Sequence, residues 1–437
     1  MRASDVAAAV GGELFGRNAD LDGAAIDSRL IRGGELFVPV VGERDGHDFI
    51  GAAIAAGAGA YVTGGPILAG TAIRVGDTAA AMLDVGRLAR TRIGERVIGI
   101  TGSVGKTSTK DLLARVLTTT YRTAASERSF NNELGVPLTL ANAPDLTEVV
   151  VVEMGARGTG HIQLLCDVAR PTVGVVTSVS GAHLEQFGSL EDVASAKSEL
   201  VAALPADGCA VLNAEDSRVA AMAGRTTASV LTFGRGRGDV TAAAVCVDAE
   251  LRPSFRLATP WGEGDVRLAV HGAHHVVNAL AAAAAALAVD VPLERVIAGL
   301  EQAQLSALRM ELATGRSGVL VLNDSYNANP TSVAAALDAL AALPARRRIA
   351  VLGTMAELGA TGAAAHAAVA RQADALDIRL VSVAEPAYGA DGPDAADSIE
   401  EAMEILGSLG DGDAVLVKAS RVVGLERLAE RLVDSEG

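Results

Sequence analysis

A strand, a glycine-rich loop and a helix follow one another directly between Val97 and Thr120. The strand reads VIGI, the loop TGSVG, and the helix begins with KTSTK. Apolar residues recur on one face of this helix, at Leu112, Leu113, Val116 and Leu117. Two more apolar strands follow, EVVVVEMG at 148–155 and TVGVVTSV at 172–179. Unbroken Val/Ile strands that alternate with helices predict a parallel sheet with helices on both faces.

The chain has 437 residues, which is too long for one hydrophobic core, so we expect several domains. Residues 1–77 are predicted to form a small α/β domain, with strands in ELFVPVV and AYVTGG. Residues 78–311 are predicted to form the central parallel-sheet domain, beginning with a helix that Asp77 is expected to cap. Residues 312–437 contain strands such as GVLVLND and DAVLVKAS between Ala-rich helices, a pattern typical of a Rossmann-like α/β domain.

The formal net charge of the chain is −16, so it repels nucleic acids and anionic lipid surfaces. No apolar run reaches the roughly 20 residues of a membrane span, and the N-terminus does not resemble a signal peptide. Three separate cysteines, Cys166, Cys209 and Cys246, fit a reducing compartment, and we expect unreactive core thiols. These features predict a cytoplasmic protein with neither a nucleic-acid partner nor membrane insertion.

The loop after VIGI has the properties of a phosphate-binding loop. Gly102 and Gly105 allow a tight turn, Lys106 offers a positive charge to terminal phosphates, and Thr107 offers a hydroxyl to Mg²⁺. Ile100 stands where the longer form of this motif has its first glycine, so the loop is a shorter variant; an ordinary glycine-rich turn is the alternative. The predicted nucleotide-binding residues are Gly102, Ser103, Val104, Gly105, Lys106, Thr107 and Ser108.

Glu153 ends the most apolar strand of the chain. A carboxylate after four valines is costly to bury unless it is paired or binds a cation, and phosphate loops need such a group to hold the metal. The alternative is an acid that reaches solvent at the strand end. His183 follows the next strand and Lys197 lies on a predicted helix; taken alone, a structural histidine and a surface lysine are the ordinary interpretations.

Longer motifs extend across the chain in a consistent order. They are TGSVGKTSTK, NNELGVPLTL at 131–140, EMGARGTGHI at 153–162, NDSYNANPTS at 323–332 and LVKASR at 416–421. With these motifs the chain resembles the Mur ligases, the ATP-dependent amide-forming enzymes of peptidoglycan precursor synthesis. The resemblance implies a monomer that joins D-alanyl-D-alanine to UDP-N-acetylmuramoyl-tripeptide through an acyl phosphate. It also implies that the central domain is like that of P-loop ATPases and that the cofactors are ATP and Mg²⁺.

The resemblance also implies roles for individual residues. Lys106 would bind the β- and γ-phosphates, and Thr107 and Glu153 would ligate Mg²⁺. His183 would lie beside a second Mg²⁺, which a carbamylated Lys197 would support. The nucleotide would also contact Asn278 on its adenine side and Arg309 and Asp324 at its phosphates and ribose, with Lys418 a further candidate. The substrate-side residues implied are Ser28, Arg29, Asn131, Asn132, Asn327 and Asn329.

The sequence departs from the family pattern at a few positions. His275 stands where relatives have the nearer asparagine of the adenine motif, and Ser178, Thr354 and Ala419 also replace common residues. The phosphate and Mg²⁺ positions are intact, so these changes bear on the adenine contact more than on the reaction class. Three alternatives stay open: a related ligase that adds another amino acid or dipeptide, a P-loop phosphotransferase, and a scaffold without turnover.

Overall fold

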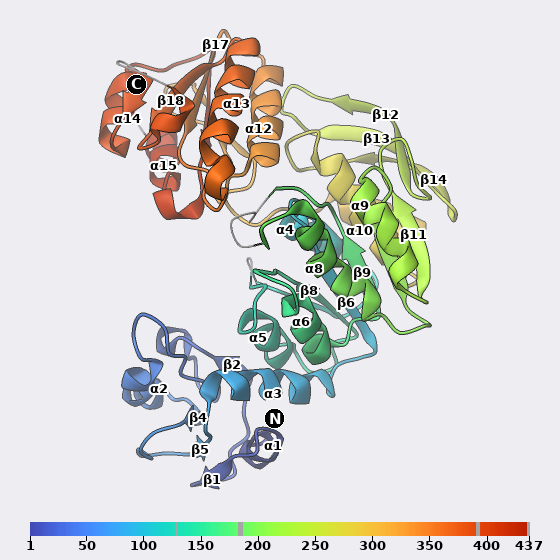
Figure 1. Ribbon diagram of the computed structural model, residues 1–437, viewed down its shortest axis with the longest axis vertical. Coiled ribbons are helices and arrows are strands. Elements are labelled where there is room, and N and C mark those ends of the chain that lie inside the picture. Colours follow the sequence, from blue (N-terminus) through green and yellow to red (C-terminus); the bar gives the residue numbers. More distant parts are fainter. Residues whose placement is uncertain (128–129, 182–186, 390–393, 435–437) are drawn as a thin grey trace.

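The computed structural model spans residues 1–437 and is described here except at 128–129, 182–186, 390–393 and 435–437. Three α/β units follow one another along the long axis of the molecule (Figure 1), from the blue N-terminal sheet to the orange and red C-terminal sheet. Within the described ranges, no helix combines the length and hydrophobicity needed to cross a lipid bilayer.

The first unit is built on a five-stranded sheet of order β1-β5-β4-β3-β2, in which only β1 runs antiparallel to its neighbour. Its elements are α1 (Ala3–Ala9), β1 (Glu13–Phe15), β2 (Ala24–Ala25), β3 (Leu36–Phe37), α2 (Ile50–Ala55), β4 (Ala60–Thr63) and β5 (Ala72–Arg74). Strand β3 is shorter than ELFVPVV suggested, because Pro39 has no N–H with which to continue the ladder.

The central unit is a six-stranded parallel sheet of order β11-β10-β9-β6-β8-β7. Its strands are β6 (Arg96–Thr101), β7 (Thr123–Ala125), β8 (Val149–Glu153), β9 (Val173–Val176), β10 (Cys209–Asn213) and β11 (Ser229–Phe233). Its helices are α3 (Thr78–Arg90), α4 (Lys106–Leu117), α5 (Gly135–Ala141), α6 (His161–Ala169), α8 (Leu190–Ala202), α9 (Ser217–Ala221), α10 (His275–Leu287) and α11 (Leu293–Glu301). The parallel sheet predicted from the apolar strands is confirmed.

Alternate residues of the strands face two different helical layers, as a doubly covered sheet requires. Ile98 and Ile100 pack with α4 and α10 on one face, whereas Val97 packs with α3, α5 and α6 on the other. The predicted apolar face of α4 is confirmed, since Leu112, Leu113, Val116 and Leu117 are all fully buried. The cap predicted for α3 is also confirmed, because the Asp77 carboxylate accepts from the amides of Ala79 and Ala80.

Small side chains let the helices of the central unit approach one another closely. Helix α10 carries eight consecutive fully buried residues, Ala279–Ala286, of which only Leu280 is larger than alanine. In α11, a Cβ added to Gly299 would lie 2.5 Å from the Cα of Val116 in α4. Helices α10 and α11 therefore pack closely against α4, the helix that follows the glycine-rich loop.

A three-stranded antiparallel sheet, of order β12-β13-β14, interrupts the central unit before α10. Its strands are β12 (Thr241–Val247), β13 (Pro253–Thr259) and β14 (Gly262–Arg267). Cys246 lies on β12 and is exposed, so the expectation of a core thiol is wrong there; β12 is an edge strand, and its residues from Ala243 to Val247 are all exposed or half-buried. Cys166 is buried and Cys209 is half-buried.

The last unit is a six-stranded sheet of order β15-β16-β20-β17-β18-β19, parallel except for β15. Its strands are β15 (Glu311–Thr314), β16 (Leu320–Asn323), β17 (Arg347–Leu352), β18 (Arg379–Val383), β19 (Ala395–Ala396) and β20 (Asp413–Lys418). Its helices are α12 (Pro330–Ala342), α13 (Gly362–Ala375), α14 (Ile399–Leu406) and α15 (Glu426–Asp434). Helices α12 and α13 pack on one face and α14 and α15 on the other, as in a Rossmann-like domain.

Replacing Gly299 by alanine should destabilise the protein by about 1–3 kcal/mol, because the added methyl group overpacks the contact with the α4 backbone. Gly51→Ala is the matched control, since a Cβ at this helical glycine meets nothing within 4 Å; it should be neutral or stabilise by about 0.5–1 kcal/mol. Thermal unfolding of both variants measures the difference. Equal melting temperatures would contradict the close packing of α11 on α4.

Candidate functional site

The glycine-rich loop lies between the end of β6 and the start of α4, and two of its positions accept only glycine. Gly102 has φ +148° and Gly105 has φ +87°, values in the region that L side chains avoid. A Cβ on Gly102 would lie 1.9 Å from the Thr177 hydroxyl, and one on Gly105 would lie 2.4 Å from the Asn278 side-chain oxygen. The backbone therefore passes directly against the end of β9 and the start of α10.

The loop amides fall into two groups. Ser103 and Val104 donate to the backbone oxygen and the hydroxyl of Ser178, at 2.9 and 3.1 Å, so these amides hold the loop in shape. Helix α4 begins at Lys106, and no side chain caps it. The first amides of a helix have no intrahelical acceptor and lie at its positive end. The donors that suit phosphate oxygens are therefore those at the start of α4.

Glu153 and Thr107 meet where β8 and the loop come together, because parallel strands end at the same edge of a sheet. The Thr107 hydroxyl donates to the Glu153 carboxylate at 2.7 Å, and Asn131 donates to its other oxygen at 2.9 Å. Arg309 donates to the Thr107 hydroxyl at 3.0 Å. Glu153 is only 1% exposed, so the alternative of an acid that reaches solvent is wrong. The oxygen donors of Thr107 and Glu153 form a set that suits a hard divalent cation.

Two lysines of the central unit, Lys106 and Lys197, lie close enough for their charges to interact. Lys106 donates to the Gly102 carbonyl at 2.7 Å. Burial lowers the pKa of its ammonium below the usual value, while the Glu153 carboxylate opposes this change and Arg309 adds to it. Lys197, in α8, is 4% exposed, so the interpretation as a surface lysine is wrong. Burial, and then the charge on Lys106, hold the pKa of Lys197 well below that of an exposed lysine. His183 lies outside the described residues.

The start of α10 reaches the loop through Asn278, whose amide donates to Nδ1 of His275 at 3.1 Å. Burial, with His274 next, keeps the pKa of His275 well below its usual value, so the ring is neutral near pH 7. With Nδ1 as acceptor, the ring proton is on Nε2, which is buried without a hydrogen-bond partner among the described residues. His275 thus presents one unsatisfied donor where the family pattern has an asparagine.

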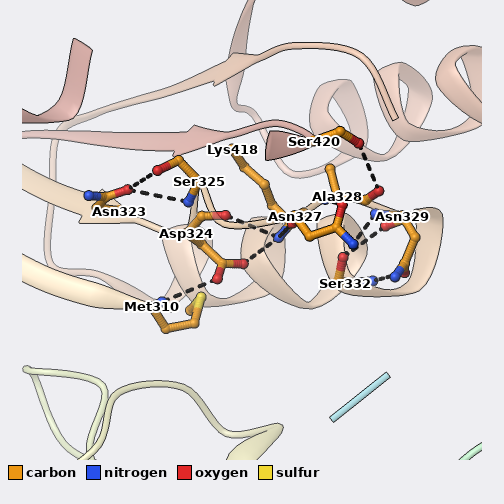
Figure 2. Close-up of polar contacts among 10 residues, drawn as sticks. All are labelled: Met310, Asn323, Asp324, Ser325, Asn327, Ala328, Asn329, Ser332, Lys418 and Ser420. Carbon is orange, nitrogen blue, oxygen red and sulfur yellow. Dashed lines mark hydrogen bonds and ion pairs between the residues drawn. The ribbon is translucent and has the colours of Figure 1, made fainter. Parts of the chain in front are cut away.

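The last unit contributes a second polar cluster, at the ends of β16 and β20 (Figure 2). Lys418 is 2% exposed. Its ammonium donates to the Asp324 carboxylate at 2.5 Å and to the backbone oxygens of Asp324 and Asn327 at 3.3 and 2.7 Å. The other oxygen of the Asp324 carboxylate accepts from the amide of Met310 at 3.2 Å. Asn329 caps α12 in a reciprocal pair with Ser332. Lys418 therefore fixes the loop that carries the predicted Asn327 and Asn329.

Arg309 joins the two polar clusters. Its guanidinium lies over the ring of Tyr326, 4.3 Å from the centroid, and donates to Thr107 in the central unit. The Tyr326 amide donates to the backbone oxygen of Leu308, which holds the two segments together. Figure 1 shows the orange C-terminal unit next to the central unit.

The remaining predicted residues, Ser28, Arg29 and Asn132, lie in the N-terminal half of the chain. The side-chain oxygen of Asn132 accepts from the amides of Leu134 and Gly135, so it holds the turn that precedes α5. Ser28 and Arg29 lie on a short 3₁₀ helix of the first unit, where the Arg29 guanidinium pairs with Asp27. In Figure 1 this unit lies at the opposite end of the molecule from the C-terminal sheet.

Sequence reasoning missed two contributors to the site. Ser178 holds the glycine-rich loop in shape, because its hydroxyl accepts from the amide of Val104. The sequence showed that Ser178 departs from the family pattern, but it did not show this contact. Ser126 supports Glu153, because its hydroxyl accepts from the Glu153 amide at 3.2 Å. A serine at the end of a short strand carries no sequence signal that would single it out.

Comparisons with known proteins show which family and which structures the chain resembles. Family models match the Mur ligase middle domain over residues 100–286 and the Mur ligase glutamate ligase domain over residues 308–421. A UDP-N-acetylmuramoyl-tripeptide–D-alanyl-D-alanine ligase from Mycobacterium bovis is 43% identical over 364 residues, 76% of this chain and 71% of the relative. The Escherichia coli enzyme of the same name is 36% identical over 353 residues, 80% of this chain and 78% of the relative.

Solved structures extend the likeness over the whole fold. MurF from Acinetobacter baumannii superposes with a TM-score of 0.89 at 30% identity, covering 99% of this chain and 98% of that one. The MurF ligase of Thermotoga maritima, solved in complex with ADP, gives a TM-score of 0.84 at 27% identity, with 95% and 98% covered. From these matches, and from the phosphate loop joined to a buried carboxylate, we conclude that the chain belongs to the Mur ligase family.

Proposed function

We propose that the protein joins D-alanyl-D-alanine to UDP-N-acetylmuramoyl-tripeptide, with cleavage of ATP to ADP and phosphate, in the cytoplasm. The relatives that support this proposal carry that activity in their names and match most of the chain. The observation that carries it is the contact among Glu153, Thr107 and Arg309, which brings a phosphate loop, a carboxylate and the C-terminal unit to one point.

The reaction needs two steps, because a carboxylate is a poor acyl donor. A terminal carboxylate oxygen of the tripeptide attacks the γ-phosphorus of ATP, the bond to the β-phosphate oxygen breaks, and ADP leaves. The amine of the dipeptide then attacks the acyl carbon, phosphate leaves with the activated oxygen, and the amine loses a proton. Both steps bring anionic groups together, so positive charge and oriented donors are what the protein must supply.

The residues of the loop supply those groups. Lys106 and the first amides of α4 would neutralise the β- and γ-phosphates, and Arg309 would reach the phosphates from the C-terminal side. Thr107 and Glu153 would hold Mg²⁺, which withdraws charge from phosphoryl oxygens when it is bound. Lys197 would serve a second cation as its carbamate; its lowered pKa favours the free amine that reacts with carbon dioxide.

The three units would divide the work between them. We assign the UDP end of the acceptor to residues 1–77, with Ser28 and Arg29, and the nucleotide to residues 78–311, with Asn278 on its adenine side. Residues 312–437 would hold the dipeptide, near the loop of Asn327 and Asn329. Asp324, fixed by Lys418, would face the ribose from that unit.

Phosphate release tests the proposal directly. The assay contains ATP, Mg²⁺, UDP-N-acetylmuramoyl-tripeptide and D-alanyl-D-alanine, and each is omitted in turn. We expect release only from the complete mixture, with a UDP-linked pentapeptide in the mass spectrum. Release without the dipeptide would indicate a phosphotransferase, and release with a different amine would indicate a related ligase. No release from the complete mixture would indicate a scaffold.

Replacing Glu153 by glutamine should lower the rate of phosphate release at least about 100-fold, because the site loses the charge that holds the cation. Glu148→Gln is the matched control, since this acid precedes the opposite end of β8 and pairs with Arg122. It should retain roughly the wild-type rate, because such exposed ion pairs contribute little. Comparable rates for the two variants would remove Glu153 from the site.

Replacing Gly105 by alanine should abolish nucleotide binding, because the methyl group would overlap the Asn278 side chain and push the loop away from α10. Gly160→Ala separates this overlap from backbone strain. Gly160 precedes α6 with φ +85°, close to the +87° of Gly105, but a Cβ there meets nothing within 4 Å. Calorimetric titration with AMP-PNP and Mg²⁺ should show binding by Gly160→Ala only. Binding by Gly105→Ala with wild-type affinity would argue against this role of the loop.

A further inference from the structure

A buried ion pair lies on α4 one turn beyond Lys106, and the reaction described above makes no use of it. The ammonium of Lys110 lies 2.9 Å from the carboxylate of Asp111, and the two side chains are 4% and 11% exposed. Burying two charges costs free energy that their attraction recovers only with good geometry and further hydrogen bonds. The partners of this pair therefore indicate what it holds in place.

Lys110 holds the segment that supports Glu153. Its ammonium donates to the backbone oxygen of Ser126 at 2.7 Å. The Ser126 amide donates to the oxygen of Val151 in β8 at 3.0 Å, and its hydroxyl accepts from the Glu153 amide at 3.2 Å. A displacement of Ser126 would thus reach Glu153 through the backbone of β8.

Asp111 holds the segment that carries Arg309. One oxygen of its carboxylate pairs with Lys110, and the other accepts from the amide of Ser306 at 2.7 Å. Ser306 lies three residues before Arg309, whose guanidinium donates to Thr107. The ion pair is therefore the point of α4 from which one chain of contacts leads to Glu153 and another leads to Arg309.

We propose that Lys110 and Asp111 are positioning residues that set Glu153 and Arg309 relative to the phosphate loop, each through its own chain of contacts. The proposal rests on the function assigned above and adds two residues to it. Lys110 governs the cation side of the site, through Ser126. Asp111 governs the nucleotide side, through Ser306.

The two chains of contacts predict a different binding defect for each substitution. A loss of overall stability would not produce this difference. In Lys110→Met the Mg²⁺ concentration for half-maximal effect should rise about 10- to 100-fold, the range for partners that orient a metal ligand. Its affinity for AMP-PNP at saturating Mg²⁺ should stay close to wild type. In Asp111→Ala the affinity for AMP-PNP should fall about tenfold whether Mg²⁺ or EDTA is present. Asp111→Asn should restore that affinity, because its side-chain oxygen can still accept from Ser306.

Calorimetric titration of AMP-PNP at a series of Mg²⁺ concentrations measures both quantities without turnover. Arg115→Met is the control, since it removes an exposed cation from the same helix. Lys110→Met leaves Asp111 unpaired and can unfold the protein, so melting temperatures are measured, and Lys110→Met/Asp111→Asn repeats the test without the unpaired charge. Unchanged Mg²⁺ requirements in Lys110→Met and in the double variant would overturn the proposal, as would equal defects in Lys110→Met and Asp111→Ala.

The phosphate-release assay on the wild-type protein distinguishes a failure of the positioning proposal from a failure of the ligase proposal. Amide formation by the wild type together with unchanged variants refutes only the positioning role. The opposite result is that the variants differ in AMP-PNP binding as described but the wild type forms no amide. This result supports the positioning role and refutes the ligase assignment.

Discussion

The candidate site depends on one hydrogen bond, from the Thr107 hydroxyl to the buried carboxylate of Glu153. The bond exists because β6 and β8 are adjacent parallel strands, with Ile100 paired to Glu153 in register. A buried carboxylate without partners would be unfavourable, and here Asn131 and Thr107 both donate to it. Arg309 reaches the same hydroxyl from the start of the C-terminal sheet. A charge at the end of one strand thus organises contacts from three separate segments of the chain.

The parts of the fold that were predictable from the sequence are those with a strong local pattern. The Val/Ile strands, the apolar face of α4 and the cap at Asp77 depend on neighbours in sequence, and all three are confirmed. The glycine-rich loop was predictable for the same reason, since its glycines are needed by the local backbone. Family resemblance supplied the remaining site residues, and their individual roles stay predictions.

What the sequence left open depends on contacts between distant segments. Lys197 looks like any helical lysine, and only tertiary packing shows that it is buried beside Lys106. Lys418 gains its importance from Asp324 and Asn327, about ninety residues earlier in the chain. Asn132 was assigned to the substrate side from the family resemblance, and the sequence did not show that its side-chain oxygen also accepts from the amides of Leu134 and Gly135. Cys246 is exposed because it lies on the edge strand β12, whose residues from Ala243 to Val247 are not covered by the core. The number and spacing of the cysteines could not have shown this.

The bond from Arg309 to Thr107 has a geometric consequence for any movement of the C-terminal sheet. Arg309 lies two residues before β15, so the last unit is tethered to the phosphate loop by the length of a single side chain. A hinge motion that separates the two units by more than the length of the Arg309 side chain breaks its hydrogen bond to Thr107. The Thr107 hydroxyl then loses a donor. Separation of the last unit from the central unit and the loss of a hydrogen-bond donor at Thr107 are therefore one event.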